Sequence, residues 1–174
     1  MLKHYVISFL IVCFASLPAI AQQPSANEVL KKAYRQAAVQ HKNVLVIFRA
    51  SWCGWCNKMD SSIHDPEVRT FFLNNYVITH LTIQETESKK DLENPGAMAI
   101  YTKYGGSDEQ GIPYWLIFDK DGKLLIDSQM KPGVNAGCPA TKKEVAYFIE
   151  ALKATSHMTP AEASAVTTIF RRND

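Results

Sequence analysis

The chain has 174 residues, of which 47% are hydrophobic and 21% are charged, and its formal net charge is +2 at pH 7. This length suits one well-buried domain, and the composition is that of a folded soluble protein, not of a disordered or fibrous one. A charge so close to neutral gives no indication of nucleic-acid binding.

The first 21 residues differ in character from the rest of the chain. Lys3 precedes the apolar run YVISFLIVCFASL, and PAIA ends in the small-x-small pattern that signal peptidase requires. We predict a signal peptide over residues 1–21, one domain over 22–174, and an exported protein, either periplasmic or secreted. The alternative is a retained membrane anchor, but the apolar run is well short of the roughly 20 residues that span a bilayer.

The first elements of the domain lead towards two closely spaced cysteines. Ser25 and Glu28 have capping-box spacing and predict a helix. Its expected apolar face is Val29, Leu30, Ala33, Ala37 and Ala38. The apolar run 44–48 then predicts a strand buried on both faces. A second helix should start at Gly54, break near His64, and resume to about residue 74 with Asp65 as its N-cap.

The second half of the domain alternates in the same way. Residues 76–83 predict a strand, and a helix should start near Ser88 and continue through residues 97–105. Residues 111–127 read as a hairpin with its turn at 121–122. Capping signals at Thr141 and Thr159 predict a core helix and a short last helix. This order implies a mixed α/β sheet covered by helices on both faces, with a parallel crossover between the first two strands.

The segment RASWCGWCNKM contains Cys53 and Cys56 at CxxC spacing, which suits a zinc site, a structural disulfide or a redox-active dithiol. Zinc needs four ligands, and the remaining cysteine and histidines show no paired spacing, so we expect no metal. A structural bridge across so short a loop would remove little entropy from the unfolded chain. A cysteine at a helix N-terminus has its thiolate stabilised by unpaired amides and the helix dipole, which favours the redox interpretation.

Three segments together resemble the thioredoxin family: VLVIFRASWCGWCNKM, NPGAMAIYTKYG and GIPYWLIFDKDGK. They look like the active-site strand and helix, the middle helix and the cis-proline hairpin of that family, and the similarity extends over about residues 25–153. The motif WCGWC is similar in particular to that of exported bacterial thioredoxin-like proteins. The resemblance implies the thioredoxin fold, here with an extra short C-terminal helix, and a thiol-disulfide oxidoreductase.

Carried over to matching positions, the resemblance implies that Cys53 is the nucleophile and Cys56 the resolving thiol, in a cycle that needs no bound cofactor. It also implies that Pro113 is the cis-proline beside the dithiol. The residues expected to contact substrate are Trp52, Gly54, Trp55, Ile112 and Pro113. Two positions depart from the family: Ile47 stands where thioredoxin has a buried aspartate, and Trp55 replaces the usual proline.

The function predicted from the sequence is thiol-disulfide exchange on protein disulfides, with reduction or isomerisation slightly favoured because the motif contains no histidine. Its partners would be substrate proteins and a redox protein, which can be membrane-bound, and we expect a monomer. The alternative is a non-catalytic thioredoxin-fold module that binds peptides or acts as a chaperone. We further expect Trp115 and Cys138 to be buried and the FRRND tail to be solvated.

Overall fold

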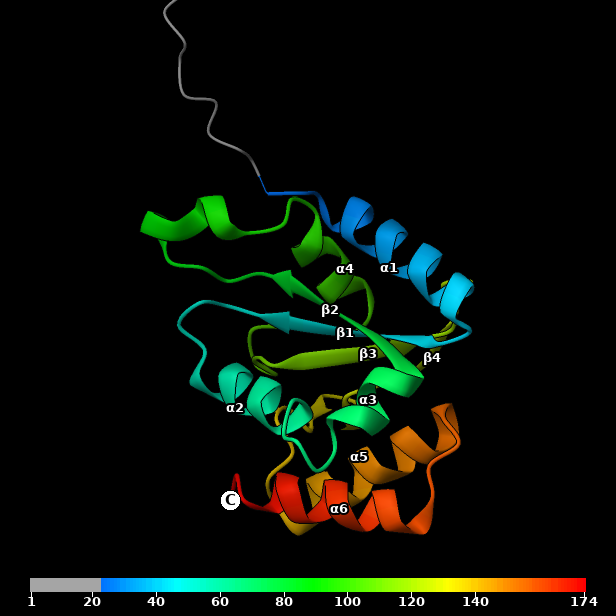
Figure 1. Cartoon of the computed structure of the whole chain (residues 1–174). Coiled ribbons are helices and arrows are strands. Elements are labelled where there is room, and N and C mark those ends of the chain that lie inside the picture. The colour runs from blue at the N-terminus through cyan, green and yellow to red at the C-terminus, as the bar shows by residue number, and fades with distance from the viewer. Residues whose placement is uncertain (1–22) are drawn as a thin grey trace, which may run out of the picture.

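The centre of the molecule is a four-stranded mixed sheet with the strand order β2-β1-β3-β4 (Figure 1). The computed structural model describes residues 23–174, so the predicted signal peptide lies outside the described residues. The strands of the sheet are β1 (Asn43–Arg49), β2 (Tyr76–Thr82), β3 (Tyr114–Phe118) and β4 (Leu124–Asp127). β1 runs parallel to β2 and antiparallel to β3, and β3 runs antiparallel to β4. The predicted crossover and hairpin are both confirmed.

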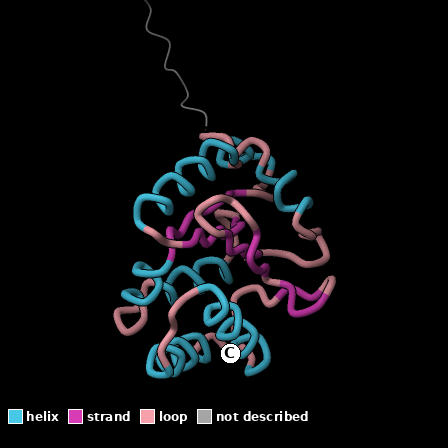
Figure 2. Tube along the Cα trace, turned by 90° about the vertical axis from the view of Figure 1, so that its right-hand side faces the viewer, coloured by secondary structure: helices cyan, strands magenta, loops and turns pink. Residues whose placement is uncertain are grey.

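Helices cover both faces of the sheet, as Figures 1 and 2 show from two directions. One face carries α1 (Ala26–Gln40) and α4 (Ala97–Lys103). The other carries α2 (Gly54–Ile63), α3 (Arg69–Asn75), α5 (Lys142–Thr155) and α6 (Pro160–Arg171). Each face therefore has its own apolar core, and the mixed α/β prediction is confirmed.

β1 is buried on both sides because its side chains alternate between the two cores. Val44, Val46 and Phe48 pack under α1 and α4, whereas Leu45 and Ile47 pack under the α2 side. All five are fully buried. A strand in this position needs apolar residues at every step, which explains its uninterrupted apolar run.

Capping boxes define the starts of three helices. In each, the N-cap hydroxyl accepts a hydrogen bond from the N3 backbone amide, and the N3 glutamate accepts from the N-cap amide. The predicted starts of α1, α5 and α6 are therefore confirmed. The predicted apolar face of α1 was wrong at one position, because Ala38 is exposed. The buried positions are Ala26, Leu30, Ala33 and Ala37.

Other boundaries differ from the prediction. Asp65 is not the N-cap of α3, because residues 66–68 form a turn in which the Asp65 carboxylate accepts from Glu67 N–H at 3.0 Å, and α3 begins only at Arg69. The helix expected from Ser88 onwards is divided into a 3₁₀ helix, η1 (Glu87–Leu92), and α4, with Pro95 between them. Proline disfavours the helical conformation of the residue before it. The small hairpin of β5 (Gln129–Lys131) and β6 (Val134–Asn135) was not predicted.

The C-terminal tail is not simply solvated, contrary to the prediction. Phe170 is fully buried, and the side-chain amide of Asn173 donates to Ser62 Oγ on α2 at 3.0 Å. Arg172 lies 3.6 Å from the Asp65 carboxylate. The tail thus holds α6 against the helix that begins at the cysteines. Within residues 23–174, no helix is both long and apolar enough to cross a membrane.

Candidate active site

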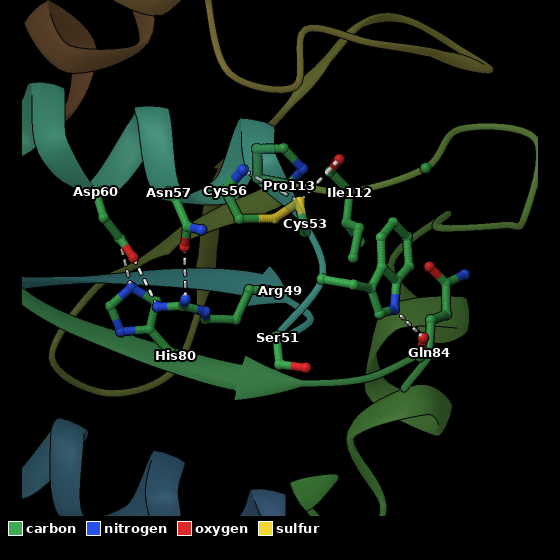
Figure 3. Close-up of a disulfide and its surroundings, with 12 residues drawn as sticks. Arg49, Ser51, Cys53, Cys56, Asn57, Asp60, His80, Gln84, Ile112 and Pro113 are labelled. Atoms are coloured by element: carbon green, nitrogen blue, oxygen red, sulfur yellow. Dashed lines mark hydrogen bonds and ion pairs between the residues drawn. A yellow bond between two sulfur atoms is a disulfide. The ribbon is translucent and has the colours of Figure 1, made fainter. Parts of the chain in front are cut away.

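The two cysteines of the CxxC motif form a disulfide at the start of α2 (Figure 3). Their Cα atoms are 5.3 Å apart, and both residues are almost completely buried. Cys53 is the N-cap of α2, and its Sγ accepts a hydrogen bond from Cys56 N–H at 3.1 Å. β1 ends four residues earlier, so the buried strand and the helix together place Cys53 just beyond the carboxyl end of an interior strand.

The loop before β3 brings Ile112 and Pro113 to the dithiol. The Ile112–Pro113 bond is cis, as the family resemblance implied, and Ile112 O lies 3.6 Å from Cys53 Sγ. Asn135, from β6, holds this loop: its side-chain amide donates to Pro113 O at 3.0 Å and to Gln110 O at 3.1 Å. Sequence reasoning missed Asn135, because nothing in its local pattern indicates a contact 22 residues away.

Two tryptophans flank the cysteines and project into solvent. Trp52 is 56% exposed and Trp55 is 49% exposed, whereas Trp115 is fully buried in the core as predicted. Trp52 Nε1 donates to Gln84 O at 2.7 Å, which fixes the ring beside the turn. A Cβ added at Gly54, the first residue of α2, would meet no atom within 4 Å. The structure therefore gathers all five predicted substrate-contacting residues around the disulfide.

A cavity of about 360 Å³ adjoins this site, and Trp55, Ile112, Pro113 and Asn135 are among the residues that line it. The cysteine in its lining is Cys138. A larger cavity of about 630 Å³ lies between α1 and β2. We take the smaller cavity as the candidate substrate site, because Ile112 and Pro113, which lie beside the disulfide, line it.

The position at which thioredoxin has its buried aspartate is occupied by the fully buried Ile47. A polar cluster lies beside it: His80 is the β2 partner of Ile47 in the sheet register, and Asp60 bridges His80 and Arg49. The Asp60 carboxylate is 2.8 Å from His80 Nε2 and 2.7 Å from Arg49 Nη1. Figure 3 shows these side chains joining α2, β1 and β2. Sequence reasoning did not find this cluster, since its members are far apart in the chain.

Opposing effects act on the pKa of Asp60. Burial raises it, but the hydrogen bond and charge of His80, together with the charges of Arg49 and His64, outweigh burial and hold the pKa below its ordinary value. Asp60 is therefore an ionised anchor for α2 and is poorly suited to accept a proton from a thiol.

Cys138 is buried, as predicted, and is the cysteine outside the disulfide in the part of the chain that the structure describes. Burial raises the pKa of its thiol to about 12, so it is protonated at neutral pH. Across residues 23–174, no three His, Cys, Asp or Glu side chains come together in a way that could hold a metal ion.

The fold and the cysteine pair are those of a thioredoxin-type thiol-disulfide oxidoreductase. The chain belongs to the thioredoxin-like family, whose family model matches residues 26–120. A search of curated proteins found no match.

Solved structures are similar to this chain at low sequence identity. The disulphide isomerase from Xylella fastidiosa Temecula1 has a TM-score of 0.50 and 18% identity, and the match covers 91% of this chain and 98% of that one. DsbH oxidoreductase has a TM-score of 0.46 and 20% identity, with coverage of 88% and 94%. The oxidised C-terminal domain of DsbD from Neisseria meningitidis has a TM-score of 0.46 and 20% identity, with coverage of 77% and 99%. At 18% identity, the similarity to the first of these structures concerns the fold alone.

Proposed function

We propose that this protein exchanges disulfides with other proteins through Cys53 and Cys56. The observation that carries the proposal is the placement of Cys53, which caps α2, lies 3.6 Å from Ile112 O, and is flanked by two exposed tryptophans. A cysteine that caps a helix has its thiolate stabilised by the helix N-terminus, and the exposed tryptophans beside Cys53 offer a surface to the incoming substrate chain. Trp52, Gly54, Trp55, Ile112 and Pro113 would contact the substrate chain around that disulfide.

In the reducing direction, the Cys53 thiolate attacks one sulfur of the substrate disulfide, and the other sulfur leaves as a thiolate that takes up a proton. The Cys56 thiol then loses its proton to solvent and attacks Cys53 Sγ. The bond between Cys53 and the substrate breaks, and the second substrate sulfur leaves with the electron pair. The substrate gains two electrons, and this chain is left with the Cys53–Cys56 disulfide. A redox partner protein would return it to the dithiol.

The helix start supplies part of the activation of Cys53. A helix dipole favours a negative charge at its N-terminus by about 0.3–1 kcal/mol, and by up to about 2 kcal/mol in favourable geometry. Cys56 N–H, at 3.1 Å from Cys53 Sγ, is one of the amide donors at that end. This support is strongest for a charge on Cys53 and weaker one turn later at Cys56.

Reduction or isomerisation is the direction we favour, since no histidine lies between the two cysteines to stabilise the thiolate and so make the disulfide strongly oxidising. The protein would act as a monomer outside the cytoplasm, as a domain of residues 22–174 released from a signal peptide of residues 1–21. The PAIA pattern and the apolar run support export.

A second candidate function is a non-catalytic module that binds extended peptides. It is favoured by the exposed rings of Trp52 and Trp55, of which Trp55 lines the 360 Å³ cavity, and by Ile47 at the position of the family's buried acid. In that case the surface around Trp52 and Trp55 would bind polypeptide, and the cysteine pair would not catalyse disulfide exchange.

Turnover of a protein disulfide with added dithiothreitol separates the two functions. The native chain should accelerate reduction at least ten-fold over dithiothreitol alone, and the double variant Cys53→Ser, Cys56→Ser should lose this acceleration. Cys138→Ala is the matched control, since it removes a thiol that is buried and protonated, and it should retain at least half of the turnover. Equal rates for the native chain and the double variant would favour the binding module.

A further inference from the structure

The segment that follows β2 is bonded to the turn that carries the first cysteine. Residues 83–85 meet residues 49–52 at four hydrogen bonds, two of them to one carboxylate. The bonds are Ile83 N–H to Arg49 O (2.9 Å), Ser51 N–H to Glu85 Oε1 (2.5 Å), Ser51 Oγ–H to Glu85 Oε2 (2.8 Å) and Trp52 Nε1–H to Gln84 O (2.7 Å). Figure 3 shows two of these residues, Ser51 and Gln84, near the disulfide.

Glu85 is an unusual residue to find in this place, because only 4% of its surface is exposed. A buried carboxylate is costly unless hydrogen bonds satisfy it, and here both oxygens accept from Ser51. The backbone N–H of Glu85 donates to Glu93 Oε1 at 2.8 Å, so the side chain of Glu93 holds the backbone of Glu85 in place. Two lysines lie near this group: Lys89 Nζ is 3.4 Å from Ser51 Oγ, and Lys90 Nζ is 3.0 Å from Glu93 Oε1.

The backbone beside Glu85 is also held in an uncommon conformation. Gln84 has a φ of 55°, in the left-handed region that few residues other than glycine adopt. Its carbonyl accepts from Trp52 Nε1, and its side chain donates to Asp108 Oδ1 at 2.9 Å. Such backbone conformations persist only where surrounding contacts hold them, and they cluster at functional sites.

We propose that Glu85 is a positioning residue of the thiol-exchange site. Its carboxylate fixes the turn that presents Trp52 and Cys53, and its negative charge opposes formation of the Cys53 thiolate. This inference rests on the proposed function, in which Cys53 is the nucleophile.

The charge effect has a definite sign. The reduced protein carries the Cys53 thiolate and the disulfide form does not, so a nearby negative charge disfavours the reduced form. The equilibrium in question consumes two glutathione molecules and the protein disulfide, and it yields the protein dithiol and one glutathione disulfide. Removing the Glu85 charge should shift it towards the dithiol. Lys89 and Lys90 partly compensate the charge, so we expect a shift of about five-fold, which is about 20 mV at 29.6 mV per tenfold.

Two substitutions separate charge from geometry. Glu85→Gln removes the charge, and its amide can still accept from Ser51 N–H and donate to Ser51 Oγ. Glu85→Ala removes both. The matched control is Glu87→Gln, which removes the charge of an exposed glutamate two residues further along the same segment.

The experiment measures the glutathione equilibrium constant, together with kcat and KM for reduction of a protein disulfide. Glu85→Gln should shift the equilibrium about five-fold towards the dithiol and leave KM within two-fold of native. Glu85→Ala should shift it similarly and raise KM at least three-fold, because Trp52 and its turn are released. Should Glu85→Ala not fold, Ser51→Ala removes one of the two bonds and should raise KM by a smaller factor.

Two results would overturn the inference: an equilibrium for Glu85→Gln within 1.5-fold of native, or an equal shift for Glu87→Gln. The glutathione equilibrium can be measured without turnover. A native chain that fails to reduce protein disulfides would therefore contradict the proposed function, while the equilibrium would still test the effect of Glu85 on the dithiol.

Discussion

Asp60→Asn should destabilise the folded protein, because it removes the charge that joins α2 to the sheet. The Asp60 carboxylate is within 2.8 Å of both Arg49 Nη1 and His80 Nε2, and these side chains are only 21–31% exposed. Hydrogen bonds to charged groups contribute about 1.5–3 kcal/mol each, and asparagine can keep part of one of them. We expect a loss of about 2 kcal/mol, which corresponds to a fall of about 4–8 °C in Tm for a domain of this size.

The same substitution should change how stability depends on pH. The pKa of Asp60 is lower in the folded protein than its ordinary value, so its contribution is complete above the unfolded-state pKa, which is about 3.9, and disappears as the pH falls through the folded-state pKa. The stability difference between native and Asp60→Asn should therefore be larger at pH 7 than at pH 3. It should shrink as the pH falls below about 4.

Urea unfolding of the disulfide form, followed by circular dichroism from pH 7 to pH 3, measures both effects. Asp121→Asn is the control: Asp121 has a cationic partner of its own, Lys120, at 2.7 Å, but its side chain is 72% exposed, so loss of its charge should cost at most about 0.5 kcal/mol. The reasoning is refuted if Asp60→Asn matches the native stability at pH 7, or if the difference between the two proteins persists unchanged at pH 3.

Three further predictions concern the cysteines and the proline loop. Cys56→Ser should accumulate mixed disulfides between Cys53 and substrate proteins, visible on non-reducing gels; a reactive Cys53 that captures no protein would count against catalysis. Cys138 should resist iodoacetamide at pH 8 in the native protein and react in urea, because burial raises the pKa of its thiol to about 12; rapid native labelling would contradict this. Asn135→Ala removes the amide that donates to Pro113 O, so it should raise the KM for a protein disulfide several-fold with little change in the Cys53 alkylation rate. An unchanged KM would exclude a role of Asn135 in substrate docking.

Much of the fold was predictable because it depends on local signals. The apolar run of β1, the three capping boxes and the hairpin turn at Gly122 act over a few residues, and each confirmed element contains its own signal. The CxxC spacing and the GIP segment likewise identified the cysteines and the cis-proline through the family resemblance. The boundaries that were wrong, at Asp65 and around Pro95, lie where turns compete with helix starts.

The tertiary structure alone decided which polar groups surround the cysteines. Asp60 meets His80 from 20 residues away, and Ser51 meets Glu85 across 34. Asn135 reaches Pro113 across 22 residues. The sequence around each of these residues does not indicate its partner. The partners are determined by the sheet register and by the packing of α2 and the loops on the sheet. Short-range propensity determines where helices and strands form, whereas contacts between distant segments depend on how those elements pack, and that packing determines the polar surroundings of the Cys53–Cys56 pair.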